Sequence, residues 1–179
     1  MTARDRLPPW HERHRLANGR ELLIRPIRPE DAEPLRAGYA LLEPSRLRDR
    51  LAGATDLTEA AADRLARPNP RTEFALVASE PEDPGTAVLA AVAYAQTDPA
   101  AHEGVFTILV SRFVAGLGVR RYLLTRIAKW ARSRGVGALH GELPRSPDVL
   151  QLAQSLGFQL HEDETDPSMV RVSLDVPRR

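Results

Sequence analysis

The fold is decided by residues 103–135, which read EGVFTILVSRFVAGLGVRRYLLTRIAKWARSRG. The apolar, β-branched run Val105–Val110 predicts a buried strand. Gly116-Leu117-Gly118 interrupts this run, and from Val119 the apolar residues recur with a helical period. The predicted helix ends near Gly135, a typical residue just beyond a helix C-terminus. Its apolar face is formed by Val119, Tyr122, Leu123, Ile127, Trp130 and Ala131.

A strand that leads through a glycine loop into a helix can bind an anion. The first turn of a helix has unpaired N–H groups and a partial positive charge. Gly116 and Gly118 would leave these N–H groups open to a phosphate, and Arg120 and Arg121 add charge beside them. The same residues also suit an ordinary strand-to-helix turn, so the loop by itself leaves both interpretations open.

The whole chain has the composition of a globular domain. It contains 179 residues, of which 42% are hydrophobic and 27% are charged, enough for one domain with a full core. The net charge of +1 gives no general attraction to nucleic acid or membranes. The sequence has no cysteine, no apolar run of membrane-spanning length and no signal-peptide core at its N-terminus. We therefore expect a cytoplasmic protein without disulfides or thiolate metal sites.

The predicted organisation is an N-terminal extension, one domain and a short tail. Residues 1–18 are expected to be a solvated arm or a short helix, with His11 and His14 too close in sequence for a His-Glu-x-x-His metal site. Residues 19–176 form the domain, and residues 177–179 the tail. Three consecutive strands, then strand, helix, strand and helix, indicate a mixed sheet. The expected strands are 21–27, 74–78, 87–95, 103–110, 138–143, 158–160 and 169–176.

Two helix starts carry capping chemistry. Asp56 or Thr58 is expected to cap the helix that runs to about Ala66. Ser146 is expected to cap a helix that has Pro147 at its first position and ends before Gly157.

Several motifs in order resemble the GNAT superfamily of acyl-CoA N-acyltransferases. The loop FVAGLG at 113–118 is similar to the family's pyrophosphate loop, Arg/Gln-x-x-Gly-x-Gly/Ala. LIRPIRPEDA at 23–32, EPSRLRDRL at 43–51, LPRS at 143–146 and LGF at 156–158 resemble the GNAT domain of bacterial protein-lysine acetyltransferases. The resemblance implies an α/β (α+β) fold with a mixed, mostly antiparallel central sheet flanked by helices in a single domain.

The resemblance also implies a site for acetyl-CoA. Glu103 stands where the family has a glutamate, and is the candidate general base, acting directly or through a water. That role requires partial burial of its carboxylate, whereas a strand-end Glu in solvent or in a salt bridge is the alternative. Main-chain groups of the central strand would bind the pantetheine arm, the loop and a following arginine the pyrophosphate, and a serine the cofactor. The residues of the central strand are Phe106, Ile108 and Val110. The pyrophosphate residues are Phe113, Val114, Ala115, Gly116, Leu117, Gly118 and Arg120, and the serine is Ser146.

Four positions depart from the family pattern: Phe113 replaces Gln or Arg, Val114 replaces Gly, Ser146 replaces Asn, and Ala153 stands where many members have a tyrosine acid. Two functions therefore stay open. The first is an N-acetyltransferase that acts on a primary amine, either a protein lysine or a small molecule. The second is a GNAT-fold module that binds acyl-CoA or a partner for regulation.

Other functions are less well supported by the sequence. Nucleic-acid binding through the basic residues of the long helix is disfavoured, because these residues form the solvent face of an amphipathic helix in a nearly neutral chain. His140 and His161 are interpreted as structural, and no metal or membrane site is expected. The sequence leaves the acceptor, any general acid and a homodimer open. The basic residues in question are Arg120, Arg121, Arg126, Lys129 and Arg132.

Overall fold

One twisted nine-stranded sheet organises the computed structural model, which describes residues 11–82, 85–162 and 166–176. The strand order is β1-β2-β4-β5-β6-β7-β9-β8, with the short β3 paired to β6. Every pair is antiparallel except β6 and β7, which run parallel. This arrangement confirms the predicted mixed, mostly antiparallel sheet. The strands are β1 (Glu12–Arg15), β2 (Glu21–Pro26), β3 (Leu42–Glu43), β4 (Glu73–Ser79), β5 (Leu89–Asp98), β6 (Glu103–Ser111), β7 (Gly137–Pro144), β8 (Gln159–Glu162) and β9 (Met169–Val176).

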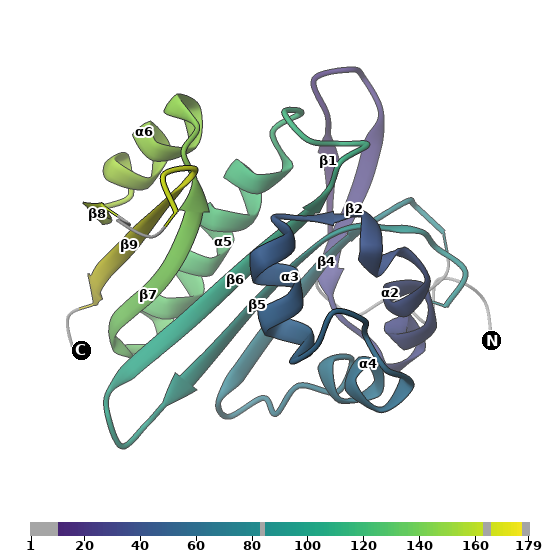
Figure 1. The fold of residues 1–179 in the computed structure, drawn as a ribbon, viewed down its shortest axis with the longest axis horizontal. Helices are drawn as coiled ribbons and strands as arrows, with labels where there is room; N and C mark the ends of the chain where they lie inside the picture. Colours follow the sequence, from purple (N-terminus) through teal and green to yellow (C-terminus); the bar gives the residue numbers. More distant parts are fainter. Residues whose placement is uncertain (1–10, 83–84, 163–165, 177–179) are drawn as a thin grey trace.

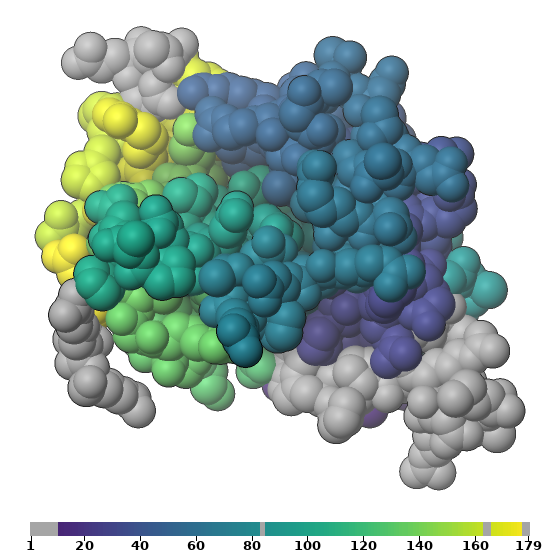
Figure 2. Space-filling view, turned by 90° about the horizontal axis from the view of Figure 1, so that it is seen from below, coloured from purple at the N-terminus to yellow at the C-terminus, as the bar shows by residue number. Residues whose placement is uncertain are grey.

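Helices cover both faces of the sheet (Figure 1). One face carries α2 (Ala32–Gly38), α3 (Ser45–Ala52) and α4 (Glu59–Leu65), with the 3-10 turns η1 (Pro29–Asp31) and η2 (Tyr39–Leu41). The other face carries α5 (Val119–Arg134) and α6 (Pro147–Ser155). Figure 2 shows the layers from the side, with the blue surface of α3 and α4 above and the green surface of the α5 region below.

Two hydrophobic clusters separate along the same layers. The α5 face buries Leu123, Ile127 and Ala131 against Phe106 and Ile108 of β6. The opposite face packs α2, α3 and α4 against the side chains of β4, β5 and β6 that point the other way, including Leu109. Alternate residues of β6 therefore enter different clusters, as the period of a strand buried on both faces requires.

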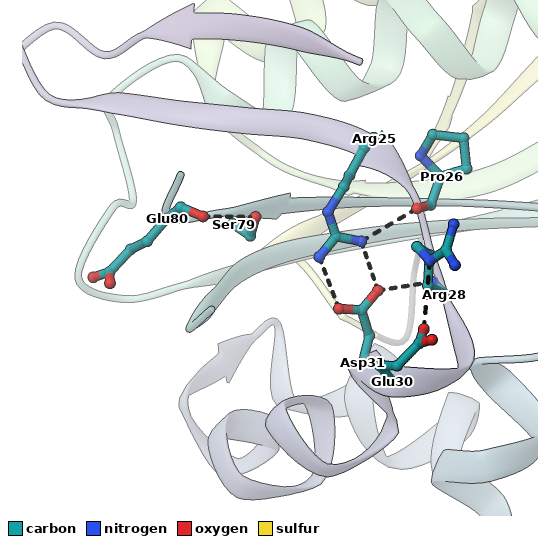
Figure 3. Close-up of polar contacts among 7 residues, drawn as sticks. All are labelled: Arg25, Pro26, Arg28, Glu30, Asp31, Ser79 and Glu80. Atoms are coloured by element: carbon teal, nitrogen blue, oxygen red, sulfur yellow. Dashed lines mark hydrogen bonds and ion pairs between the residues drawn. The ribbon is translucent and has the colours of Figure 1, made fainter. Parts of the chain in front are cut away.

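A buried ion pair connects β2 to the start of the first helix (Figure 3). Arg25 and Asp31 are fully buried, and the guanidinium donates from Nη1 to Oδ2 at 2.6 Å and from Nη2 to Oδ1 at 2.8 Å. The Arg28 amide donates to the same carboxylate at 2.7 Å. This bidentate geometry with an added backbone donor satisfies the carboxylate, as a charge out of water requires.

The N-terminal segment differs from the expected solvated arm or short helix. Residues 12–15 form β1, an edge strand that pairs with β2 from Glu12↔Ile24 to Arg15↔Glu21. Leu16, next along the chain, is 2% exposed in the α5-side core. The folded domain therefore begins before residue 19. Residues 1–10 and the predicted tail 177–179 lie outside the described residues.

The two predicted caps have different outcomes. Thr58 caps α4, because its hydroxyl accepts a hydrogen bond from the Ala61 amide at 3.1 Å. Ser146 occupies the N-cap position of α6, with Pro147 at the first helical position, but its side chain makes no capping hydrogen bond. The predicted capping role of the Ser146 hydroxyl is therefore wrong, and Ser146 lines a pocket described below.

Candidate active site

The parallel strands β6 and β7 pair only at one end. Their register runs from Glu103↔Ala138 through Gly104↔Leu139 to Val105↔His140 and stops there. Beyond that point the two strands diverge, and Figure 1 shows them spreading apart toward the N-terminal end of α5. The divergence opens the middle of the sheet, so main-chain groups of a central strand face a gap instead of a neighbouring strand.

The hydrogen-bond pattern shows which residues of β6 face this gap. The carbonyl of His102 accepts from the Ala138 amide of β7, and the Arg112 amide donates to Leu41 beside β3. Alternation along a strand therefore turns the main-chain groups of Phe106 and Ile108 to the same edge. Phe106 and Ile108 are two of the three residues that the family resemblance implied as main-chain contacts of the pantetheine arm; that role stays a prediction.

Val110, the third predicted residue of this set, has a neighbouring strand at its edge. It lies opposite Glu43 of β3, so β3 covers the far end of the edge. No pattern in the sequence predicts a two-residue strand at this position.

A pocket of about 240 Å³ lies where the gap meets the N-terminus of α5. Gly118 is the N-cap residue of α5, and Gly116 and Gly118 have φ of 77° and 95°. These left-handed conformations favour glycine. Apart from the adjoining residues of the chain, no described residue has an atom within 4 Å of the point where a Cβ would stand on either glycine. The pocket is lined by Val110, Val114, Ala115, Gly116, Gly118, Val119, Arg120, Arg121, Pro144, Ser146, Asp148 and Val149.

Solved structures with a similar fold include GNAT acetyltransferases. No family model matches the chain. The GNAT domain of S. lividans PAT is 22% identical and superposes with a TM-score of 0.69 over 94% of this chain and 99% of that one. A GNAT superfamily phosphinothricin acetyltransferase from Sinorhizobium meliloti, solved in complex with AcCoA, is 16% identical with a TM-score of 0.63, covering 87% of this chain and 89% of that one. This chain has the GNAT acyltransferase fold. A cAMP-binding acyltransferase from Mycobacterium smegmatis is 18% identical, with a TM-score of 0.57 over 94% of this chain and 48% of that one.

The pocket at the N-terminus of α5 is lined by both positive and negative side chains. Burial lowers the pKa of Arg120 to about 10, and its Nη2 donates to the Glu43 carbonyl at 3.2 Å. The prediction that Arg120 lies on the solvent face of α5 is therefore wrong. Arg121 is exposed, as predicted. Asp148, in the first turn of α6, brings one carboxylate into the same pocket. A phosphate group would meet the α5 amides and the two arginines on one wall and this carboxylate on the other.

Two residues of the predicted loop lie outside the pocket lining. Phe113 is 72% exposed, and Leu117 packs partly buried against the α5-side core. The Leu117 carbonyl also accepts from the Ala17 amide, which ties the loop to the β1–β2 turn. Leu117 therefore has a structural role, and Phe113 offers an exposed aromatic ring where the family has a polar side chain.

Glu103 differs from the expected part-buried base. Its side chain is 58% exposed at the start of β6, and its Oε1 lies 3.9 Å from Nε2 of His140 on β7. His140, interpreted from sequence as structural, is also partly exposed and lines a second pocket. Glu103 thus stands in solvent beside a histidine, an arrangement in which either group can accept a proton.

The second pocket, of about 500 Å³, lies on the α3 face of the same two strands. Its walls combine Val105, Phe106 and Thr107 of β6 with residues 140–142 of β7, and Leu47 and Arg50 of α3 close one side. Gly141 is required here, because a Cβ at this position would overlap the Phe106 ring. Phe106 also contacts Phe158 edge-on, with ring centroids 5.9 Å apart.

Sequence reasoning missed Glu142, which brings a carboxylate into the lining of this pocket. Its side chain is 11% exposed, with Oε1 3.0 Å from Nη1 of Arg50 and 3.7 Å from Nη2 of Arg46. Its Oε2 is buried and has no hydrogen-bond partner among the described residues. The available signal was weak: a charged residue within a predicted strand, with arginines nearly a hundred residues away.

The family's tyrosine acid has no equivalent at its usual position. Ala153 is fully buried in the core, so α6 presents no acid there. Tyr122 packs partly buried against the same core, as predicted, and its ring lies 4.6 Å from that of His14. Its hydroxyl is buried without a partner among the described residues.

Membrane-spanning helices and clusters of metal ligands are both absent from the described residues. No helix is long and apolar enough to cross a membrane. No group of three or more His, Cys, Asp or Glu side chains lies close enough to hold a metal ion.

Proposed function

We propose that the protein is an N-acetyltransferase that moves an acetyl group from acetyl-CoA to a primary amine. The observation that carries this proposal is the opening between β6 and β7, where pairing stops at Val105↔His140 with pockets at both sides of the gap. The pocket at the α5 N-terminus suits a pyrophosphate, and the pocket on the α3 face suits an acceptor. GNAT neighbours named as acetyltransferases support the same activity.

Binding of acetyl-CoA would use main-chain groups more than side chains. The first-turn amides of α5 and the glycines at 116 and 118 would meet the pyrophosphate, with Arg120 and Arg121 beside them. The pantetheine arm would lie along the edge of β6, where Phe106 and Ile108 present main-chain groups. Ser146, whose hydroxyl is free of a capping bond, would contact the cofactor from the α6 side.

In the transfer, the neutral amine attacks the thioester carbonyl carbon, a new C–N bond forms, and the C–S bond breaks. An alkylammonium such as lysine has a pKa near 10.4 and lacks a lone pair, so one proton must leave the amine. Glu103 or its neighbour His140 would accept that proton, directly or through a water. A second proton leaves the nitrogen to solvent as the amide forms, and the departing thiolate takes up a proton from solvent, because α6 has no tyrosine at position 153.

A binding module is the second candidate function. Phe113 in place of Arg or Gln, and the buried Ala153 in place of a tyrosine, both favour it. Such a module would bind acyl-CoA, or a partner, without turning over an amine.

A screen for acetyl-CoA-dependent release of CoA distinguishes the two functions. The acceptors are small amines, amino acids and lysine-containing proteins, and free thiol is measured. Release that requires an amine and yields the acetylated product supports the transferase. CoA binding without release from any acceptor supports the module.

A further inference from the structure

The charges around Glu142 point to the kind of amine that the second pocket takes, an inference that rests on the transferase function. Of the three buried side-chain polar atoms without a partner in the described residues, Arg25 Nε, Tyr122 Oη and Glu142 Oε2, only the last belongs to a residue that lines this pocket. A carboxylate oxygen only accepts hydrogen bonds. An oxygen that is buried and unpaired is costly, so the expected partner is a donor that arrives with the ligand.

Arginine contacts hold this carboxylate in place. Arg50 and Arg46 both approach Oε1, and Arg46 is shared with Asp166 at 3.5 Å. Pairing at one oxygen fixes the side chain and leaves the other for a ligand. A primary amine, with its N–H donors, matches that oxygen. Glu142 also lies two residues beyond His140 on β7, about 7 Å along the strand toward the open gap.

Arg171 lies beside Glu142 and has no acidic partner within the described part of the chain. Arg171 of β9 stands directly opposite Glu142 of β7 and opposite His161 of β8. The Arg171 Nη2 donates a long hydrogen bond, 3.4 Å, to the Glu162 carbonyl. No ion pair joins Arg171 to a carboxylate among the described residues. The exposed rim of the pocket therefore carries positive charge next to a buried negative one.

We propose that the acceptor is a small zwitterionic amine of the amino-acid class. Its amine would bind Glu142 Oε2 inside the pocket, and its carboxylate or similar anionic group would bind Arg171 at the rim. A guanidinium suits this role because its donors match the two oxygens of a carboxylate. A lysine residue within a protein carries no carboxylate of its own near its amine, so it would leave Arg171 unused.

The test compares α-amino acids with their α-carboxamides as acceptors, with acetyl-CoA held constant. Each pair keeps the side chain and the amine and differs in the anionic group. The amide has the less basic amine, so intrinsic reactivity favours the amide, and a preference for the acid reports recognition. We expect at least one amino acid to be acetylated with kcat/KM at least about tenfold above that of its amide.

Two variants assign the two contacts. Arg171→Gln is expected to bring the acid and amide to nearly equal kcat/KM, with the amide's own value unchanged. Glu142→Gln is expected to lower kcat/KM about 100-fold for both acceptors, with the dissociation constant of CoA unchanged. Arg13→Gln and Glu21→Gln serve as matched controls, because these residues form an exposed ion pair in β1 and β2, at the other side of the sheet. Arg171 is exposed, so its variant keeps the test valid if Glu142→Gln does not fold.

The outcomes separate this inference from the function on which it rests. If amides, simple alkylamines or lysine peptides are turned over as well as or better than the α-amino acids, the zwitterionic acceptor is overturned while the transferase function stands. So does a preference for the acid that survives in Arg171→Gln. CoA binding without turnover of any amino acid also overturns it. Failure of CoA to bind overturns the transferase function and this inference together.

Discussion

Replacing Gly118 by valine tests whether the α5 N-terminus binds the cofactor. Gly118 has a φ of 95°, so a β-branched residue is strained there by about 1–2 kcal/mol. The described residues beyond its two chain neighbours offer no clash, because none has an atom within 4 Å of the added Cβ. The side chain would instead occupy the space through which a phosphate reaches the first-turn amides. Hydrogen bonds to a charged group contribute about 1.5–3 kcal/mol each, so losing two costs at least about 3 kcal/mol. The dissociation constant of CoA should then rise about 100-fold or more.

The assay is calorimetric titration with CoA, together with thermal unfolding of each variant. Gly135→Val is the matched control, because Gly135 ends the same helix and has a φ of 61°. Its added Cβ would likewise meet no described residue within 4 Å beyond the adjoining chain. The control should lose some stability and retain its affinity for CoA. Unchanged affinity in a folded Gly118→Val protein, or equal losses in both variants, would refute the assignment of the pyrophosphate to this loop.

Three further predictions concern ligand stabilisation, the buried ion pair and the base. CoA at about a hundred times its dissociation constant should stabilise the protein by about 2.7 kcal/mol, and a thermal shift assay that finds no change at millimolar CoA would contradict the transferase. Asp31→Asn should destabilise the fold by about 3–5 kcal/mol in urea titrations, because it leaves Arg25 charged and buried, whereas the exposed Glu21→Gln should cost less than about 1 kcal/mol. Glu103→Gln should slow turnover by about 10²–10⁴ if Glu103 is the base, and the loss should shrink as pH rises because more of the amine is then neutral. Equal turnover of parent and variant at neutral pH would show that another group accepts the proton.

The architecture could be predicted from sequence because its signals are local. The apolar run of β6, the two glycines and the helical period of α5 are contiguous, and each keeps its predicted structure. Burial of Leu123 and exposure of Arg121 follow from helical periodicity alone. Order and spacing of the remaining motifs then fix the sheet type.

The parts that sequence reasoning missed depend on contacts between distant segments. The charged sequence around His14 gives no sign of an edge strand, which exists because β2 offers it a partner. Glu142 becomes a site residue only because α3 brings Arg50 over β7, and Glu103 is exposed because the end of β6 that pairs with β7 faces solvent. Such features depend on tertiary packing, which periodicity and capping rules do not describe.

Amide hydrogen exchange with and without acetyl-CoA, followed residue by residue, tests most directly whether the β6–β7 opening binds the cofactor. Slower exchange is expected in two places: the loop and first turn of α5, residues 114–121, and the gap-facing amides of Phe106 and Ile108 on β6. The edge strands β1 and β8 should exchange at unchanged rates. Protection confined to other surfaces, or none at saturating acetyl-CoA, would contradict the account.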